Sequence, residues 1–292
     1  MKNLIITGAY GFLGAALVKH FLDLKEYEIT ILVKTNSHNK RISESDLLKL
    51  NIIHVDKPDF KLKLLAINRP IILNAAIDYG RDKRLAQILE SNLVFPLDII
   101  ESIVPDVFIN FDSYFNKDSA DYGYLGHYIF SKNLLETSLQ NFKNLKIFNL
   151  KLEHLYGPKD SENKFVSQLI EALKKEKSFK MTEGIQKRDF LYVYDLIRLV
   201  EEIVQKQGMF QNKYHNFEVG TGKSIRIKDF VVEAKKIFNS ETSVCFGSLP
   251  MRTNEIMDSF ANLDLLPKFL NWKSQISIQM GLNLIKEMEN ES

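Results

Sequence analysis

The chain has 292 residues, enough for one large domain or two coupled lobes. With 39 basic and 37 acidic side chains, its net charge of +2 argues against nucleic-acid and membrane partners. Cys245 is the only cysteine, so an intrachain disulfide is excluded and a cytoplasmic location is expected. The six histidines show no metal-ligand spacing, so we expect no metal.

The chain begins with an apolar run, a loop of three glycines spaced by three, and an amphipathic stretch. A strand, glycine loop and helix in this order place backbone N–H groups and a helix N-terminus around an anion. Glycine is needed where the backbone must approach a pyrophosphate. We therefore predict a dinucleotide site here, the alternative being an ordinary tight turn. The loop residues are Gly8, Tyr10, Gly11, Phe12, Leu13 and Gly14.

Strand-like runs then alternate with helical patterns, which predicts an α/β fold with a doubly wound parallel sheet. The expected strands are Lys2–Ile6, Glu28–Val33, Ile52–Val55, Ile71–Asn74, Val107–Phe111 and Lys146–Leu150. The expected helices are Gly14–Leu24, Leu85–Ile103, Gly126–Phe142, Phe165–Lys177, Val193–Gln205 and Ile227–Phe238. The tail from Glu287 is expected to fray.

The second half is less regular and predicts a smaller α/β lobe. We assign residues 1–155, joined by about 188–220, to a Rossmann domain that binds the dinucleotide. Residues 156–187 and 221–292 form the expected substrate lobe. Ligands of such sheets bind beyond the carboxyl ends of the strands, so the chemistry is expected there.

Tyr128 and Lys132 lie one helical turn apart on the same face of an expected helix. A neighbouring cation favours phenolate, so we expect a lowered pKa for Tyr128. Ser113 follows an expected strand and can bond the oxygen that Tyr128 protonates. A second match, Tyr79 with Lys83, lies in a glycine-containing loop and is less well placed. We predict that Ser113, Tyr128 and Lys132 are catalytic, against the alternative of a capping serine and a half-buried aromatic.

The order of glycine loop, serine and Tyr/Lys pair resembles the extended short-chain dehydrogenase/reductase family of nucleotide-sugar epimerases, dehydratases and reductases. Further motifs of that family follow along nearly the whole chain. They are Asn74-Ala75-Ala76, Asn92, Lys151-Leu-Glu-His154-Leu-Tyr156-Gly157-Pro158, Lys187-Arg188-Asp189-Phe190 with Val193 and Asp195, Gly220-Thr221-Gly222 and Leu270-Asn271-Trp272.

The resemblance implies roles for individual residues. Ala75, Ala76, Asn92, Tyr128 and Lys132 would contact the cofactor. Arg188 and Arg252 would bind the substrate diphosphate, which suits the bidentate geometry of guanidinium with phosphate. The other implied substrate residues are Tyr79, His154 and Tyr156. Two departures from the family pattern, Lys151 for arginine and His154 for asparagine, predict an unusual substrate pocket.

The end of the second strand predicts NADP(H) over NAD. Val33 stands where an NAD-specific site carries an acid, and Lys34 follows. A lysine attracts a 2′-phosphate, whereas a carboxylate repels it. The alternative is that Lys34 is a solvated loop residue. Asp56, at the end of the third strand, is expected to accept a hydrogen bond from adenine or to cap a turn.

Segments around Ala76, Lys151, Thr182 and Asn254 resemble the CDP-abequose and CDP-paratose synthases. These are 4-ketoreductases that make 3,6-dideoxyhexoses for bacterial surface polysaccharide. The resemblance implies NADPH-dependent reduction of a nucleotide-diphosphate sugar, with CDP favoured, and a homodimer formed through the helices 85–103 and 126–142. The alternatives are an NAD-dependent nucleotide-sugar 4-epimerase and a non-catalytic sensor that binds NADP.

Overall fold

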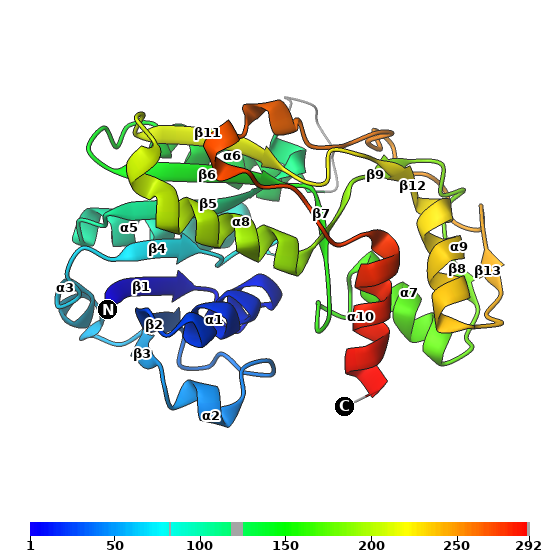
Figure 1. Ribbon diagram of the computed structural model, residues 1–292, viewed down its shortest axis with the longest axis horizontal. Helices are drawn as coiled ribbons and strands as arrows, with labels where there is room; N and C mark the ends of the chain where they lie inside the picture. Colours follow the sequence, from blue (N-terminus) through cyan, green and yellow to red (C-terminus); the bar gives the residue numbers. More distant parts are fainter. Residues whose placement is uncertain (82, 118–124, 291–292) are drawn as a thin grey trace. The chain divides into compact units, whose positions relative to one another are not determined.

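Seven strands form one sheet in the order β11-β6-β5-β4-β1-β2-β3 (Figure 1). The computed structural model describes residues 1–81, 83–117 and 125–290. Pairs β1–β2, β2–β3, β1–β4 and β4–β5 are parallel. The strands span Lys2–Thr7 (β1), Tyr27–Val33 (β2), Asn51–His54 (β3), Ile71–Asn74 (β4), Val107–Ser113 (β5), Lys146–Leu152 (β6) and Tyr214–Val219 (β11). The predicted doubly wound sheet is confirmed, and its order reverses between β1 and β4, where such sheets bind ligands.

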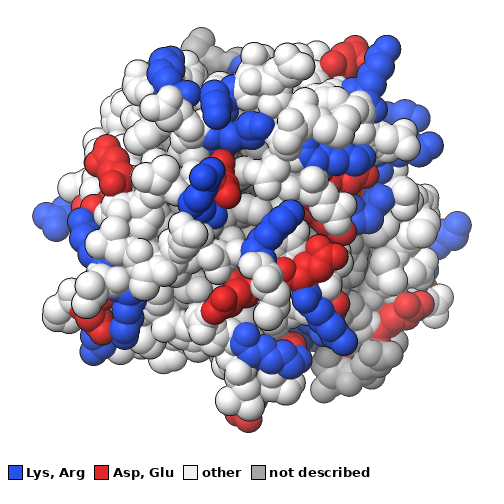
Figure 2. Space-filling view, turned by 60° about the vertical axis from the view of Figure 1, so that its left-hand side comes forward, with Lys and Arg blue, Asp and Glu red and all other residues white. Residues whose placement is uncertain are grey.

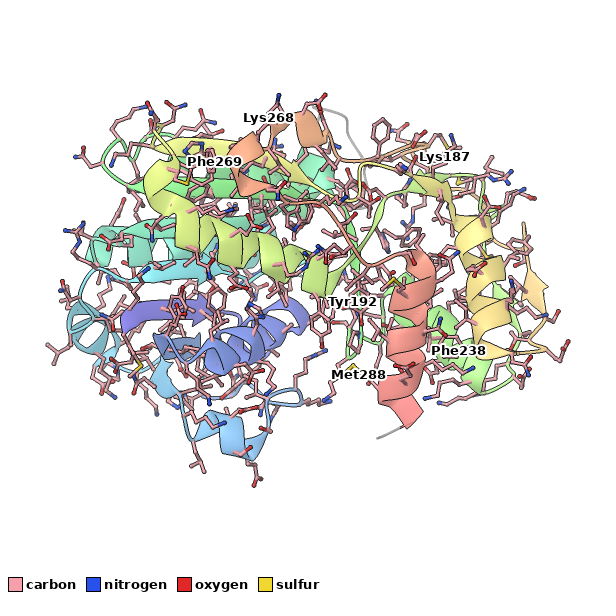
Figure 3. All side chains as sticks on the ribbon, viewed as in Figure 1. Lys187, Tyr192, Phe238, Lys268, Phe269 and Met288 are labelled. Atoms are coloured by element: carbon pink, nitrogen blue, oxygen red, sulfur yellow. The ribbon has the colours of Figure 1, made fainter. Side chains whose placement is uncertain are left out.

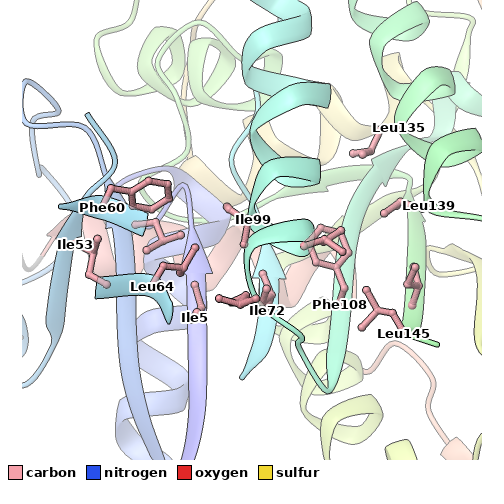
Figure 4. Close-up of a cluster of buried hydrophobic side chains, with 14 residues drawn as sticks. Ile5, Ile53, Phe60, Leu64, Ile72, Ile99, Phe108, Leu135, Leu139 and Leu145 are labelled. Atoms are coloured by element: carbon pink, nitrogen blue, oxygen red, sulfur yellow. The ribbon is translucent and has the colours of Figure 1, made fainter. Parts of the chain in front are cut away.

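Helices cover both faces of this sheet. The helices α3 (Phe60–Leu65), α5 (Phe95–Ser102) and α6 (Gly126–Leu139) bury apolar side chains against one face (Figure 4). Helix α1 (Phe12–Leu24) lies on the other (Figure 1). The core is aliphatic in the strands, as expected where a parallel sheet is buried on both sides. The cluster includes Ile5, Ile72, Phe108, Leu135 and Ile147.

The helix predicted over Leu85–Ile103 is interrupted. It consists of α4 (Leu85–Leu89), a π-helical turn (Glu90–Val94) and α5. In the turn, the Phe95 N–H donates to the Glu90 carbonyl, five residues back. Pro96 follows, and its missing N–H removes an ordinary helical bond at this point. Such turns are frequent at functional sites, and this one carries Asn92.

The described chain divides into two units. The first comprises residues up to 117, then 125–151 and 200–217. The second comprises 152–199 and 218–290. Residues 188–199 fall in the second unit and residues 200–217 in the first. The expected assignment of functions to two domains stays a prediction.

In its described residues, the second unit contains three pairs of short strands, three α-helices and the start of a fourth. The pairs are β7–β10, β9–β12 and β8–β13. Their strands are His154–Tyr156 (β7), Phe179–Lys180 (β8), Lys187–Arg188 (β9), Phe190–Tyr192 (β10), Ile225–Arg226 (β12) and Val244–Cys245 (β13). The helices are α7 (Phe165–Lys174), α9 (Ile227–Phe238), α10 (Ile278–Asn290) and the start of α8 (Val193–Lys206). Tyr192, labelled in Figure 3, lies beside α10, where Gly281 leaves room for its ring.

Several predicted boundaries need correction. Helix α1 begins at Phe12, two residues before Gly14. Helix α7 ends at Lys174, since Glu176 adopts a left-handed φ of +50° that cannot continue a helix. The tail predicted to fray from Glu287 is helical to Asn290. The pattern also missed α2 (Glu44–Leu47), α3, β11 and α10.

Charges on the face shown in Figure 2 are interleaved, basic beside acidic, with no broad area of one sign. None of the helices in the described ranges is both long and apolar enough to cross a bilayer.

Candidate active site

The glycine loop follows β1 and packs against the loop after β4. Gly8 has a φ of +63°, and a Cβ there would lie 2.6 Å from the Ala75 carbonyl oxygen and the Ala76 nitrogen. A Cβ at Gly14 would overlap the Gly8 carbonyl. Helix α1 starts directly after Gly11, so its first N–H groups face the loop. This is a cradle that side chains would fill, and it fits the phosphates of a dinucleotide.

Thr7 joins the two loops. Its hydroxyl donates to Asn74 Oδ1 at 2.9 Å and accepts from the Ala76 N–H at 3.0 Å. Because both strands end here, the loop that contains Ala75 and Ala76 is fixed beside Gly8. Ala75 and Ala76 thus lie where the order of the sheet reverses, and their expected contact with a cofactor stays a prediction.

The structure brings Ser113, Tyr128 and Lys132 together. Ser113 ends β5, and its hydroxyl hydrogen-bonds to the hydroxyl of Tyr128 in the first turn of α6. Lys132 lies one turn further along and donates to the Phe111 carbonyl at 2.6 Å. Tyr128 and Lys132 are 4% and 3% exposed. A phenol, a hydroxyl and an ammonium group thus lie together at the carboxyl end of β5.

The expected effect on the pKa of Tyr128 is wrong in direction. Burial raises this pKa well above its ordinary value, and Tyr79 and Asp112 raise it further, whereas the hydrogen bond with Ser113 lowers it. The Lys132 ammonium is directed to the Phe111 carbonyl, so it does not offset the burial. Burial also lowers the pKa of Lys132 to about 8, against the opposing effect of Asp112.

The loop after β4 places Tyr79 beside Tyr128. The rings of Tyr79 and Tyr128 stack with centroids 5.0 Å apart. Asn92 holds this loop: its Oδ1 accepts from the Asp78 N–H, and its Nδ2 donates to the Asp78 carbonyl and to Ser131 Oγ. The expected cofactor contact of Asn92 stays a prediction, and the observed bonds make it a support of the loop that carries Tyr79.

The residues after β2 form a small basic corner. Lys34 is exposed, and the Arg41 guanidinium donates to the Tyr10 carbonyl of the glycine loop at 3.1 Å. Asp56 Oδ1 accepts from both the N–H and the hydroxyl of Thr35, so Asp56 caps this turn. The Thr35 N–H lowers the pKa of Asp56. The adenine contact expected of Asp56 stays a prediction.

In the second unit, Arg188 is already paired. It is 4% exposed, forms an ion pair with Glu255, and donates to the carbonyls of Lys187 and Ile256 at 2.7 and 2.6 Å. Its expected contact with a diphosphate stays a prediction, and such a contact requires Glu255 to share the guanidinium. Arg252 is exposed on the segment after β13.

His154 and Tyr156 lie on β7. Burial lowers the pKa of His154 to about 3, with Lys164 and Arg188 contributing, so its imidazole is neutral at pH 7. Tyr156 is 0% exposed, and its ring contacts Phe190 among other aromatic residues. This side chain belongs to the core of the second unit, and its implied substrate role stays a prediction.

A polar cluster behind Ser113 escaped the sequence analysis. Asp112 accepts from the Ser113 N–H at 2.8 Å and from the amides of Asn116 and Asn149 at 2.9 and 3.0 Å. In the same unit, Lys151 forms an ion pair with Glu136 of α6 at 3.2 Å. The available signal was the recurrence of asparagine near the ends of otherwise apolar strands.

Comparison with known proteins identifies the family of the chain. A family model described as the NAD dependent epimerase/dehydratase family matches residues 4–220. The chain belongs to this family. The resemblance to extended short-chain dehydrogenases/reductases is thereby confirmed.

Two relatives named CDP-abequose synthase, from Salmonella muenchen and Salmonella typhimurium, are each 31% identical to this epimerase/dehydratase family member. The alignments cover 99% and 98% of this chain and 98% of each relative. The UDP-glucose 4-epimerase of Thermotoga maritima, solved with UDP-glucose, has a TM-score of 0.82 at 18% identity over 99% of both chains. The UDP-glucuronic acid 4-epimerase of Bacillus cereus, solved with UDP-glucuronic acid and NAD, has a TM-score of 0.79 at 19% identity, covering 98% and 99%. These two structures share the fold.

Proposed function

We propose that this chain is an NADPH-dependent nucleotide-sugar 4-ketoreductase. Its favoured substrate is CDP-4-keto-3,6-dideoxyglucose, and its product is CDP-abequose or CDP-paratose. The observation that carries the proposal is the hydrogen-bonded pair of Ser113 and Tyr128 with Lys132 one turn away. The full-length similarity at 31% identity to two CDP-abequose synthases supports the substrate class.

The side chains divide the reaction between them. When bound, the dinucleotide supplies a hydride to the carbonyl carbon at C4. Ser113 orients the carbonyl oxygen, and Tyr128 donates its phenolic proton to that oxygen, which gives the alcohol. Burial keeps Tyr128 protonated at neutral pH, which suits a proton donor. A proton from solvent then restores the phenol.

Support for NADP(H) comes from the basic corner after β2. Lys34 is exposed there, Arg41 is held on the glycine loop, and no acid stands at Val33. We expect Lys34→Asp to lower the preference for NADPH over NADH in kcat/KM at least about tenfold, since a carboxylate repels the 2′-phosphate. Lys143→Asp, at an exposed lysine beyond α6, serves as the control. A wild-type preference for NADH would refute the cofactor assignment.

The reaction is tested by NADPH oxidation with 4-keto sugars generated on CDP, dTDP, GDP and UDP. Rapid oxidation with the CDP sugar is expected, and NMR of the product then gives the C4 configuration. Tyr128→Phe should lower turnover by about 10²–10⁴-fold, because it removes the phenolic proton and keeps the ring. No oxidation with any carrier, together with co-purified NAD and turnover without reductant, would establish the 4-epimerase alternative.

We also propose that the protein is a homodimer. Val94 of the π-helical turn and Phe130 of α6 are 45% and 47% exposed, which is costly for apolar side chains in a monomer. Light scattering should give twice the mass of the chain, and Phe130→Lys should weaken the association. A monomeric wild type would refute this part.

A further inference from the structure

Behind the candidate catalytic residues, five side chains close a ring of hydrogen bonds. Asn116 Nδ2 donates to Asp112 Oδ2 at 2.9 Å and to Glu136 Oε2 at 2.7 Å. Asn149 Nδ2 donates to Asp112 Oδ2 and to Asn216 Oδ1, both at 3.0 Å. Asn216 Nδ2 donates to Glu136 Oε1 at 2.7 Å, which completes the ring. Two carboxylates are thus bridged by three amides. We call these five residues the carboxylate ring.

A row of hydrogen bonds connects the carboxylate ring to β1, the strand that precedes the glycine loop. Each strand in the row contributes one polar residue. Thr7 on β1 donates to Asn74 on β4, Asn74 to Asn110 on β5 at 3.0 Å, and Asn110 to Asn149 on β6 at 2.7 Å. The bonds all run in the same direction. The parallel register places Thr7, Asn74 and Asn110 side by side, so this row crosses the sheet near the strand ends.

Burial and hydrogen bonds hold the side chain of Asp112 in one position. Asp112 is 4% exposed, Asn116 is 4% exposed and Asn149 is fully buried. Both hydrogens of the Asn116 and Asn149 amides are used by ring partners, so rotating either of these two amides leaves a buried donor unpaired. Such satisfied polar networks rigidify the residues that they contain.

Asp112 is adjacent to the backbone groups that hold Ser113 and Lys132, two of the candidate catalytic residues. It precedes Ser113 and accepts that residue's N–H at 2.8 Å. The carbonyl of Phe111, on its other side, accepts from the Lys132 ammonium. Along the chain, Asp112 therefore lies between Phe111, whose carbonyl binds Lys132, and Ser113, whose N–H its carboxylate accepts.

We propose that Asp112, a member of the carboxylate ring, is a positioning residue that sets the orientation of Ser113 and of the Phe111 carbonyl that binds Lys132. Its consequence for catalysis rests on the function proposed above. Asp112 itself contacts no reacting atom, and acts through those two residues.

The electrostatics agree with this placement. Two influences determine the pKa of Lys132: burial lowers it to about 8, and Asp112 on β5 opposes the decrease. The titratable groups that face Tyr128 are Tyr79, Asp112 and Tyr114. Glu136, the other carboxylate of the ring, pairs instead with Lys151.

The test is direct titration of Lys132 in the full-length protein, by NMR of lysines labelled with ¹³C at Cε. Lys132→Arg assigns the signal. In Asp112→Asn we expect the midpoint of Lys132 to fall by about one unit, because the opposing carboxylate is removed. Asp112→Ser, which lacks the added amide, repeats the measurement and covers a failure of the first variant to fold.

Glu136→Gln is the matched control. It changes only the Glu136 side of the ring: Asp112 keeps its hydrogen bonds from the Ser113 N–H and the Asn149 amide, and its charge stays beside Lys132. We expect the Lys132 midpoint to stay within about 0.3 units in this variant. An unchanged midpoint in both Asp112 variants, or equal shifts in the Asp112 and Glu136 variants, would overturn the proposal.

Kinetics give the catalytic consequence. The alkaline limb of the kcat/KM profile should move to lower pH in Asp112→Asn, by the same amount as the NMR midpoint. A wild type inactive on every 4-keto sugar would refute the proposed function, while the NMR titration would still decide the role of Asp112.

Discussion

The ring of Tyr79 stacks on the ring of Tyr128, with centroids 5.0 Å apart and an interplanar angle of 27°. Tyr79 comes from the loop after β4 and Tyr128 from the first turn of α6. The contact covers the phenol of Tyr128 and contributes to its raised pKa. Tyr79 thus shapes the environment of Tyr128, the proton donor of the proposed reaction.

We expect Tyr79→Ala to lower the free energy of unfolding by about 1 kcal/mol, because an aromatic pair is lost from a partly exposed site. Tyr79→Phe keeps the stack and should stay within about 0.5 kcal/mol of wild type. Urea unfolding of both variants measures the difference. Equal losses in the two variants would show that the hydroxyl of Tyr79, and not its ring, provides the stability.

Gly8→Ala tests the cradle at the switch point of the sheet. An alanine at φ +63° is strained, and its Cβ would lie 2.6 Å from the Ala75 carbonyl oxygen. We expect a loss of at least about 2 kcal/mol in unfolding free energy, and an increase of at least about tenfold in the Kd for NADPH. Fluorescence titration with NADPH gives the second quantity.

Gly208→Ala is the control for Gly8, since a Cβ at Gly208 meets nothing within 4 Å. Its unfolding free energy should change by less than about 0.5 kcal/mol and its NADPH affinity should be unchanged. Full NADPH affinity in Gly8→Ala would remove this loop from the dinucleotide site.

The ion pair of Arg188 and Glu255 is buried, with side chains 5% and 9% exposed. We expect Glu255→Ala to cost about 3 kcal/mol in unfolding free energy, because it leaves a buried guanidinium without its carboxylate. Glu171→Ala breaks an exposed pair with Lys175 and should cost far less. Chemical denaturation of the two variants tests this, and similar losses would contradict the burial of Arg188.

His154 predicts a loss of stability in acid. Its pKa is about 3 in the folded chain, below the ordinary value of 6.5, because burial disfavours the cation. Between these values the unfolded chain binds a proton that the folded chain does not, so the stability present above pH 6.5 is lost as the pH falls toward 3. His154→Gln should remove this component.

The measurement for His154 is urea unfolding of wild type and His154→Gln from pH 7 to pH 4. We expect the wild type to lose about 2 kcal/mol more than the variant over this range. Parallel curves for the two proteins would show that His154 titrates normally.

Strands β1 and β11 show which strands the sequence pattern predicts and which it misses. Strand β1 is an apolar run between a terminus and a glycine loop, and its prediction needed no tertiary information. Strand β11 reads Tyr-His-Asn-Phe-Glu-Val, where polar residues obscure the period, and it forms because the edge of β6 is available for pairing.

By itself, the sequence determined the order in which the candidate site residues follow along the chain: the glycine loop, Ser113 and the Tyr128/Lys132 pair. These are local patterns, in which spacing along a strand, loop or helix fixes which groups share a face. Only the tertiary structure decided the charge states and the polar partners. The pKa of Tyr128 depends on burial by other segments, and the link from Asp112 to Asn149 depends on strand register. Burial and register arise from contacts between residues far apart in the chain, so no local pattern contains them.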